Sequence, residues 1–262
     1  MKVTLLAHTQ LSGEFLDLME TELGISKFSA MSKAVTDGDF VALTAIRTCY
    51  SHKKPTEIVP TEGDKYFGDR GSEANRLFNH IAKSGHTSTL EHISFTFAVE
   101  GVSRALLAQL TRHRVGWSYS VQSQRYVKLS SESRSGGFDY VVPESIKTAG
   151  GKWLVDAGGV LAPMLSAQEV FEEYMMPAIQ EMYDRLIEMG IPQEDARSVL
   201  PNAAATNLVV TCNLRALIDF VSKRDRSKGA QGEIVELANV MADKVRTVEP
   251  RLAQFLGGGD DD

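Results

Sequence analysis

The pattern of apolar and polar residues predicts three strands, and one of them shows clear alternation. The segment ISFTFAV at 93–99 puts its aromatic and branched residues on one face and Ser94, Thr96 and Ala98 on the other. This pattern is typical of a strand with one buried face. The opening segment MKVTLLAH predicts a second short strand, and NLVVTC at 207–212 predicts a buried one.

Helical spacing of apolar residues predicts helices over 39–50, after Ser72 and after Ser103. Ser72 and Ser103 are the expected N-caps, and Gly85 is the expected end of the helix that follows Ser72. In the second half, a helix from Gln168 is expected to be kinked by Pro177. Its predicted apolar stripe consists of Phe171, Met175, Ile179, Met182 and Leu186.

Two more helices are predicted towards the C-terminus. Asn213 is the expected N-cap of LRALIDFVSKR, and the last helix carries Ile234, Leu237, Met241, Val245 and Val248. The segments 130–139 and 147–159 are expected to be surface loops. Strands and helices are mixed without a regular βαβ alternation, so the predicted class is α+β with a mostly antiparallel sheet. We expect a single compact domain over 1–256, followed by a flexible acidic tail, GGGDDD, at 257–262.

Composition narrows the function. The net charge is −6, which argues against a general nucleic-acid binder, so no nucleic-acid partner is expected. The two cysteines, Cys49 and Cys212, form no CxxC pair, which favours a reducing, cytoplasmic setting. No apolar run is long enough to span a membrane, and no membrane partner is expected.

Hydrogen-bond donors are concentrated in the stretch TRHRVGWSYSVQSQRY at 111–126. Gln109, Arg112 and His113 are spaced i, i+3 and i+4, so they are expected on one helix face. An RHR tripeptide alone favours a solvated basic turn. Ser123, Gln124 and Arg125 add further donors, and together the run offers more than one phosphate requires.

Two other clusters carry candidate chemistry. In GHTSTLEH at 85–92, His86 and His92 flank Glu91, but the spacing lacks the HExxH pattern and a third ligand, so no metal is expected. A structural role in a turn is the expectation for His92, and His86 is the better functional candidate.

The C-terminal cluster contains Arg197, Asn213, Arg215, Asp219 and Arg224. Arg215 and Asp219 are four residues apart and could simply pair on a helix surface. Arg224 could be an ordinary solvated arginine. No nucleophile elbow, dinucleotide-binding glycine motif or phosphate-binding loop accompanies these residues.

Taken together, these motifs resemble the flavin-dependent thymidylate synthases. That family is marked by RHR, a spacer of seven residues, then Ser and x-Arg-Tyr. Here RHRVGWSYSVQSQRY matches both ends, and SGHTSTLEHISFTF, ARSVLPNA and CNLRALIDF follow the family order. The resemblance implies a homotetramer with active sites where subunits meet. It also implies conversion of dUMP to dTMP, with methylenetetrahydrofolate as one-carbon donor, FAD as cofactor and NADPH as reductant.

The resemblance also assigns residues to ligands. It implies FAD contacts from Ser88, Arg112, His113, Arg114, Val115, Asn213, Arg215 and Asp219. It implies dUMP contacts from Gln109, Arg112, Gln122, Ser123, Gln124, Arg125, Arg197 and Arg224. Arg224 is the expected catalytic residue that activates the uracil ring, and His86 is expected beside the flavin.

The chain departs from the family pattern in four places. The spacer from Val115 to Gln122 is one residue too long, and Val121 stands where Glu or Gln is usual, so Gln122 takes over that contact if the loop shifts. Asp219 replaces an Asn, and a carboxylate there repels phosphate unless Arg215 pairs with it. The segment DRSKGAQGE after Arg224 lacks the usual His.

Two other functions stay open from the residues alone. A non-catalytic nucleotide- or RNA-binding protein could use the same arginines, but it would be colourless and sensitive to salt. A metal-dependent nucleotide hydrolase would need a cluster of carboxylates or histidines that the sequence does not offer.

Overall fold

The computed structural model describes residues 1–33, 35–68, 72–154 and 164–257. A four-stranded antiparallel sheet lies at its centre. The strands are ordered β1 (Lys2–His8), β2 (Ser94–Ser103), β6 (Ala205–Asn213) and β3 (Trp117–Val121). The three predicted strands are thus confirmed, whereas β3 lies in a segment for which the sequence predicted none. The α+β class and the antiparallel sheet are also confirmed.

The sheet buries one face and leaves the other partly open. Phe95, Phe97 and Val99 of β2 are fully buried, as the alternation predicted. The expectation of a buried strand at 207–212 holds for only one face, because Asn207 is exposed and Val209 is 41% exposed. Strand β6 alternates because helices cover only one side of it.

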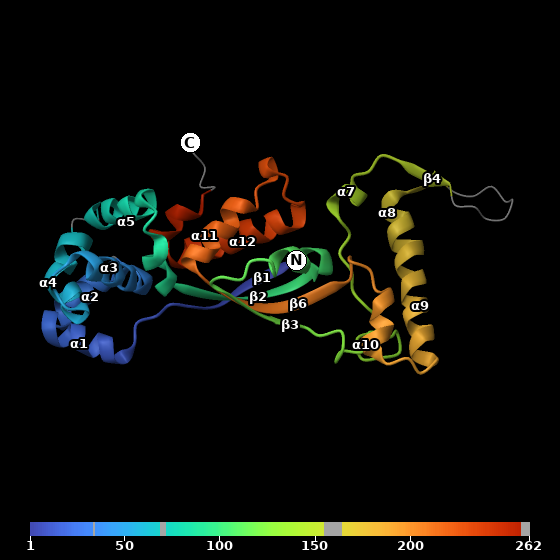
Figure 1. Cartoon of the computed structure of the whole chain (residues 1–262), viewed down its shortest axis with the longest axis horizontal. Helices are drawn as coiled ribbons and strands as arrows, with labels where there is room; N and C mark the ends of the chain where they lie inside the picture. Colours follow the sequence, from blue (N-terminus) through green and yellow to red (C-terminus); the bar gives the residue numbers. More distant parts are fainter. Residues whose placement is uncertain (34, 69–71, 155–163, 258–262) are drawn as a thin grey trace.

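Three helices cover the buried face of the sheet (Figure 1): α6 (Arg104–Leu110), α11 (Leu214–Lys223) and α12 (Gly232–Val248). The predicted caps are confirmed: Ser103 Oγ accepts from the Leu106 amide at 3.0 Å, and Asn213 Oδ1 accepts from the Ala216 amide at 2.8 Å. A 3₁₀ turn, Leu252–Leu256, follows α12. The predicted apolar face of α12 is buried except for the partly exposed Val248.

Helix α6 is shorter than predicted. It ends at Leu110, so Arg112 and His113 lie in the turn that follows, and the prediction that they share a helix face with Gln109 is wrong. The chain has to leave the helix here because Trp117 already pairs with Cys212 across the sheet.

Five helices form the N-terminal end of the molecule, at the left of Figure 1. They are α1 (Gly13–Leu23), α2 (Ile25–Ser32), α3 (Asp37–Tyr50), α4 (Pro55–Phe67) and α5 (Ser72–Ser84). Helix α5 begins at Ser72, whose side chain lies outside the described part, and it ends as predicted before Gly85, which has φ +73°. A 3₁₀ turn, Thr87–His92, then leads into β2.

The opposite end of the molecule holds shorter elements. They are α7 (Glu144–Lys147), β4 (Lys152–Leu154), β5 (Met164–Ser166), α8 (Ala167–Glu169), α9 (Met176–Glu188), α10 (Gln193–Ala196) and a 3₁₀ turn, Arg197–Val199. The loop predicted over 130–139 is confirmed. The loop predicted over 147–159 is wrong where β4 pairs with β5, and 155–159 lie outside the described residues.

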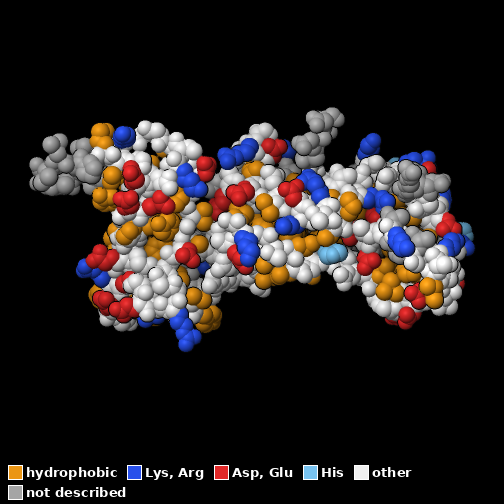
Figure 2. All heavy atoms as spheres, turned by 180° about the vertical axis from the view of Figure 1, so that it is seen from behind, with side chains coloured by type: hydrophobic (Ala, Val, Ile, Leu, Met, Phe, Trp, Pro, Cys, Tyr) orange, Lys and Arg blue, Asp and Glu red, His pale blue; other side chains and the backbone are white. Residues whose placement is uncertain are grey.

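A π-helical turn, Val170–Met175, shifts the buried stripe of the long helix. Within it the Met176 amide donates to the Phe171 carbonyl, five residues back, and Pro177 follows without an N–H of its own. Phe171, Met176 and Tyr183 are therefore buried, whereas two members of the predicted stripe, Met175 and Met182, are 49% and 56% exposed. Hydrophobic side chains accordingly gather on the surface at this end (Figure 2).

Buried apolar side chains form two clusters. The larger one joins the N-terminal helices to the sheet and its covering helices, and the smaller one surrounds Phe138, Phe171, Met176 and Ala204. The domain bounds 1–256 stay a prediction, and 258–262 of the predicted tail lie outside the described residues. No helix among the described residues is long and apolar enough to cross a membrane.

Candidate active site

The RHR segment forms a tight turn between α6 and β3. The Tyr119 hydroxyl lies 2.9 Å from the Leu110 carbonyl oxygen and 2.7 Å from that of His113, so it closes the turn from the strand side. Burial raises the pKa of this phenol well above its usual value. The hydroxyl therefore stays protonated and remains a hydrogen-bond donor.

Gly116 brings this turn against the start of α11. Its φ is +76°, and a Cβ at this position would lie 2.7 Å from Asn213 Nδ2 and 2.8 Å from the Ala216 Cβ. The backbone N–H of Asn213 donates to the Gly116 carbonyl at 3.1 Å. A glycine is required here both for the left-handed conformation and for the close approach. Asn213 thus connects two of the predicted site segments.

Arg224 and His113 are in direct contact. Arg224 follows α11 as its C-cap, and its Nη2 and Nε lie 2.8 and 3.3 Å from His113 Nε2. Nη2 also donates to the Gln109 carbonyl at 3.2 Å. Burial, and then the charge of Arg224, lower the pKa of His113. The imidazole is therefore neutral at neutral pH and accepts from the guanidinium, which the RHR turn holds in place.

Two cations of the same turn are available to a ligand. Arg112 and Arg114 are exposed, and within the described residues neither guanidinium group has a salt bridge or a side-chain hydrogen bond. Burial and the charge of Arg112 lower the pKa of nearby Arg224, which indicates an excess of positive charge. Guanidinium groups and the side-chain amide of Asn213 are the donors that a diphosphate prefers, so this turn fits the anionic part of a dinucleotide cofactor.

Arg215 and Asp219 do not pair with each other, which was one of the alternatives that their spacing left open. Arg215 instead pairs with Glu91 of the 3₁₀ turn, and Asp219 pairs with Lys223 at 2.8 Å. Its pair with Glu91 attaches Arg215 to the 3₁₀ turn that also carries the exposed Ser88. The carboxylate of Asp219 is balanced by a cation, although by a different one from that expected.

His86 has a partner that the sequence did not reveal. Its Nδ1 lies 2.6 Å from the hydroxyl of Tyr50, and the two rings meet edge to face with centroids 5.7 Å apart. Tyr50 ends α3 and is 58% exposed. Neither Tyr50 nor Glu91 was assigned a function from the sequence, because each meets its partner through the packing of separate segments.

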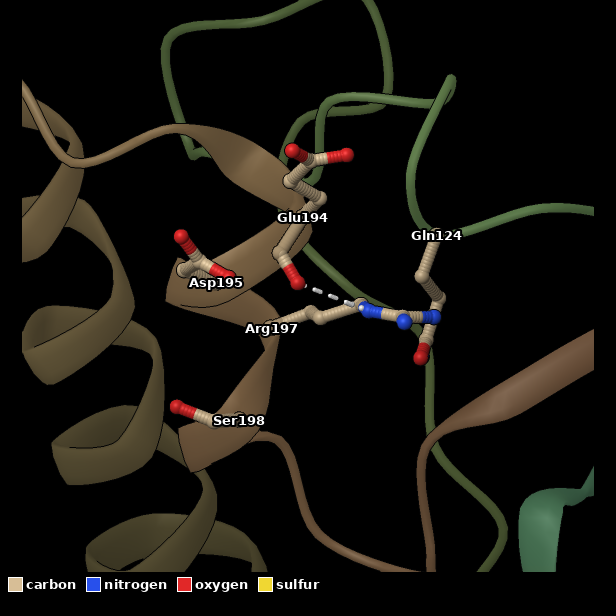
Figure 3. Close-up of a pocket in the computed structure, with 5 residues that line it drawn as sticks. All are labelled: Gln124, Glu194, Asp195, Arg197 and Ser198. Carbon is tan, nitrogen blue, oxygen red and sulfur yellow. Dashed lines mark hydrogen bonds between the residues drawn. The ribbon is translucent and has the colours of Figure 1, made fainter.

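The remaining predicted residues form a second group. Gln124 and Arg197 line an open hollow of about 460 Å³ together with Glu194, Asp195 and Ser198 (Figure 3). Arg125 lies beside it and pairs with Glu194 at 3.2 Å. The Ser123 hydroxyl oxygen accepts from the Arg125 amide at 3.1 Å. The side chain of Gln122 is directed elsewhere, since it accepts from Asn207 Nδ2 at 2.9 Å.

Strand β3 separates the two groups. Gln109 and the RHR turn precede Trp117 in the chain, and Arg224 contacts that turn through His113. Ser123 to Arg125 follow Val121 at the other end of the strand. At about 3.3 Å per residue, the five-residue strand spans about 13 Å between its first and last Cα atoms. Helix α6 runs alongside with the opposite direction, since Arg104 at its start donates to the Gln122 carbonyl at 2.9 Å. One chain therefore does not bring the two groups to one point.

Neither cysteine is arranged as a nucleophile. Cys212 is buried in β6, and burial raises the pKa of its thiol well above the usual value. Cys49 is exposed on α3. Within the described residues, no three His, Cys, Asp or Glu side chains lie together as a metal site would require.

Comparison with known proteins assigns the family. The family described as Thymidylate synthase complementing protein matches residues 31–251. The chain is 42% identical over 230 residues to a flavin-dependent thymidylate synthase from Geobacter sulfurreducens, covering 88% of this chain and 87% of that protein. It is 35% identical over 225 residues to the enzyme of that name from Clostridium tetani, covering 83% and 81%.

Solved structures share the fold. A UMP/dUMP methylase from Streptomyces cacaoi, bound with 5-Br dUMP, superposes with a TM-score of 0.64 at 23% identity, covering 97% of this chain and 93% of that one. A flavin-dependent thymidylate synthase from Helicobacter pylori, complexed with FAD and dUMP, gives a TM-score of 0.59 at 22% identity, covering 95% and 97%. With the matched family and the two relatives above, the conclusion is that the chain belongs to the flavin-dependent thymidylate synthase family.

Proposed function

We propose that this protein converts dUMP to dTMP, with FAD as cofactor, methylenetetrahydrofolate as one-carbon donor and NADPH as reductant. The observation that carries the proposal is the RHR turn. It presents two exposed guanidinium groups without carboxylate partners and holds a third, that of Arg224, against a neutral His113. An acidic protein gathers cations in this way where an anionic ligand binds.

The residues near the RHR turn are assigned to FAD. Arg112 and Arg114 offer charge-assisted hydrogen bonds to the diphosphate, and Asn213 adds a neutral donor. The same role is assigned to Ser88, His113, Val115, Arg215 and Asp219. Asp219 is compatible with this role because Lys223 neutralises it. When bound, the reduced flavin supplies the hydride that converts the transferred one-carbon group into a methyl group.

The second group is assigned to dUMP. Arg125 and Arg197 provide forked donors suited to a phosphate, and Ser123 and Gln124 provide neutral ones. Gln109, Gln122, Arg112 and Arg224 complete the expected set. Ser123 is assigned to positioning rather than to nucleophilic attack, because none of its neighbours Gln122, Gln124 and Arg125 is a base that could activate it.

Arg224 is the proposed catalytic residue. C5 of uracil becomes a better nucleophile when N3 loses its proton, because negative charge is then drawn into the ring. A fixed cation near N3 and its carbonyl oxygen stabilises that anion, most strongly where water is excluded. Arginine remains charged at any working pH, and the contacts with His113 and the Gln109 carbonyl fix its direction. His86, bound by Tyr50, is assigned a place beside the flavin ring.

A complete site is proposed to form between chains. One dUMP needs both Arg224 and the phosphate-binding group, which lie beyond opposite ends of β3. A second copy of the chain, arranged so that its Arg125 and Arg197 approach the first chain's RHR turn, supplies the missing half. This arrangement is the proposed reason for assembly into a homotetramer.

The proposal is tested with the purified protein. It should be yellow, with the absorbance bands of bound flavin, and should form dTMP from dUMP only when methylenetetrahydrofolate and NADPH are present. Arg114→Ala should lower FAD affinity by about one to two orders of magnitude, the scale of one lost charge-assisted hydrogen bond. A colourless protein that forms no dTMP when FAD is added would contradict the proposal.

A further inference from the structure

Arg125 is already engaged by an anion from its own chain. Its Nε and Nη2 both donate to Glu194 Oε2 at 3.2 Å. These two nitrogens form one edge of the guanidinium, the edge that ordinarily grips a carboxylate or a phosphate. Both side chains are about half exposed, so a ligand can reach the pair from solvent.

The surroundings of this pair are prepared for an anion. The nearby hollow contains Arg197, whose Nε donates to the Glu194 carbonyl at 2.9 Å and whose side chain extends towards Gln124 (Figure 3). Gln124 Nε2 is buried without a hydrogen-bond partner among the described residues, although Gln124 lines the hollow. A buried amide without an acceptor is unfavourable, so a ligand oxygen here would satisfy it.

The segment that carries Glu194 is fixed to the Arg125 turn by a second contact. The side-chain amide of Gln193 donates to the Arg125 carbonyl. Glu194 therefore stays close to Arg125 whether or not the two charged groups touch. In Figure 3 its carboxylate points away from Arg197, so it neutralises Arg125 and leaves the Arg197 guanidinium to a ligand.

We propose that Glu194 is an internal substitute for the substrate phosphate: its carboxylate holds Arg125 until the phosphate of the nucleotide replaces it. This inference rests on the proposed function, because it takes dUMP as the ligand of this group. The Nε–Nη2 edge of Arg125 cannot hold both anions at once. Nucleotide binding thus includes the exchange of the Glu194 carboxylate for the phosphate on Arg125. Glu194 keeps Arg125 oriented in the free protein, but its displacement weakens the binding of the nucleotide.

The exchange makes Glu194 a specificity-determining residue. A ligand with a phosphate can displace the carboxylate, because the phosphate provides the same forked contact with more negative charge. A nucleoside without phosphate cannot displace it and gains nothing from Arg125. The effect of Glu194 should therefore be confined to ligands that carry phosphate.

The test compares the native protein, Glu194→Gln and Glu194→Ala by calorimetric titration with dUMP, inorganic phosphate and deoxyuridine. Removal of the carboxylate should tighten dUMP and phosphate binding about two- to five-fold, the range expected for release of an exposed ion pair. Deoxyuridine binding should stay unchanged. The control Glu181→Gln removes a carboxylate paired with Arg185 on the surface of α9 and should leave dUMP binding unchanged.

The variant Asp195→Asn distinguishes the exchange of anions on Arg125 from a general effect of removing negative charge near the hollow. Asp195 also lines the hollow, but the carboxylate that pairs with Arg125 is that of Glu194. An equal gain from Asp195→Asn, or weaker dUMP binding by both Glu194 variants, would overturn the inference while leaving the proposed function standing. If the native protein binds phosphate but neither binds nor converts dUMP, the proposed function fails. A tighter phosphate complex of Glu194→Gln would then still support the exchange.

Discussion

At the scale of single residues, Arg224 depends on the neutral state of His113. The imidazole accepts from Arg224 only while its Nε2 is unprotonated, and burial keeps it so by lowering its pKa. A proton on His113 would place two cations in contact. The RHR turn therefore contributes two exposed cations and one positioning base.

Replacement of Arg224 should separate chemistry from cofactor binding. Arg224→Ala should retain FAD and lower turnover about 10²–10³-fold, the scale for loss of one preorganised donor. Arg224→Lys keeps the charge but cannot contact both His113 and the Gln109 carbonyl with one planar fork, so its turnover should also fall. Turnover is measured at saturating dUMP, with bound flavin read from absorbance. The control Arg185→Ala, on the surface of α9, should keep native turnover. If Arg224→Ala turned over dUMP at the native rate, Arg197 would become the candidate for activation of the uracil ring.

Glu249 is a buried carboxyl outside the proposed site. It follows α12 as its C-cap and accepts from the Thr36 hydroxyl and, at 3.2 Å, from the Gly38 amide at the start of α3. Its side chain is 1% exposed, and His8 Nδ1 lies 3.9 Å away. Burial, with a smaller contribution from Asp39, raises its pKa to about 7.

This pKa predicts how stability changes with pH. Because the folded-state pKa lies above the ordinary value of 4.5, Glu249 contributes most stability below about pH 4.5 and loses that contribution as the pH rises to about 7. The expected loss is on the order of 2–3 kcal/mol. Glu249→Gln cannot titrate, so urea unfolding between pH 5 and 8 should show a flatter pH dependence for this variant. Glu181→Gln should keep the native dependence, and an unchanged slope in Glu249→Gln would refute the assignment.

At the scale of elements, the turn between α6 and β3 is set by one glycine. Gly116 combines a left-handed backbone with a close approach to Asn213 and Ala216, so a side chain there meets two obstacles. Gly101 offers a matched comparison: its φ is +66°, but a Cβ would have no atom within 4 Å.

Gly116→Ala should therefore be more harmful than Gly101→Ala. The conformational cost is about 1–2 kcal/mol at either position. At Gly116 the overlap with the cap of α11 adds to that cost and displaces Arg112 and Arg114. Thermal unfolding should show a larger loss for Gly116→Ala, and only this variant should bind FAD more weakly. Equal losses in both properties would mean that the close packing of the turn is unimportant.

At the scale of the whole molecule, the proposed sites between chains can be tested by mixing. Arg125→Ala and Arg224→Ala should each be inactive alone, because every site lacks one essential group. The two variants are mixed in equal amounts and refolded together. If subunits combine at random, about a quarter of the sites would contain an intact Arg224 from one chain and an intact Arg125 from the other. Activity should therefore reappear at about that fraction of the native value. No recovery, in mixtures proven to contain both chains, would place both groups in one chain.

Features with local signals could be predicted from the amino-acid sequence alone. The one-sided burial of 93–99 follows from its alternation, and Ser103 and Asn213 cap helices because a cap depends on neighbours three residues away. The family motifs are also contiguous segments, so they can be recognised in the sequence and the candidate site residues within them can be identified without a structure.

Long-range packing, by contrast, selects which residues meet. Arg215 pairs with Glu91 rather than Asp219, and Arg125 pairs with Glu194, because separate segments pack side by side. The π-helical turn before Pro177 rotates the buried stripe away from Met175, which a regular period could not anticipate. Local spacing specifies a helix or a strand, but a side chain far along the chain becomes a partner only when the tertiary fold places it there.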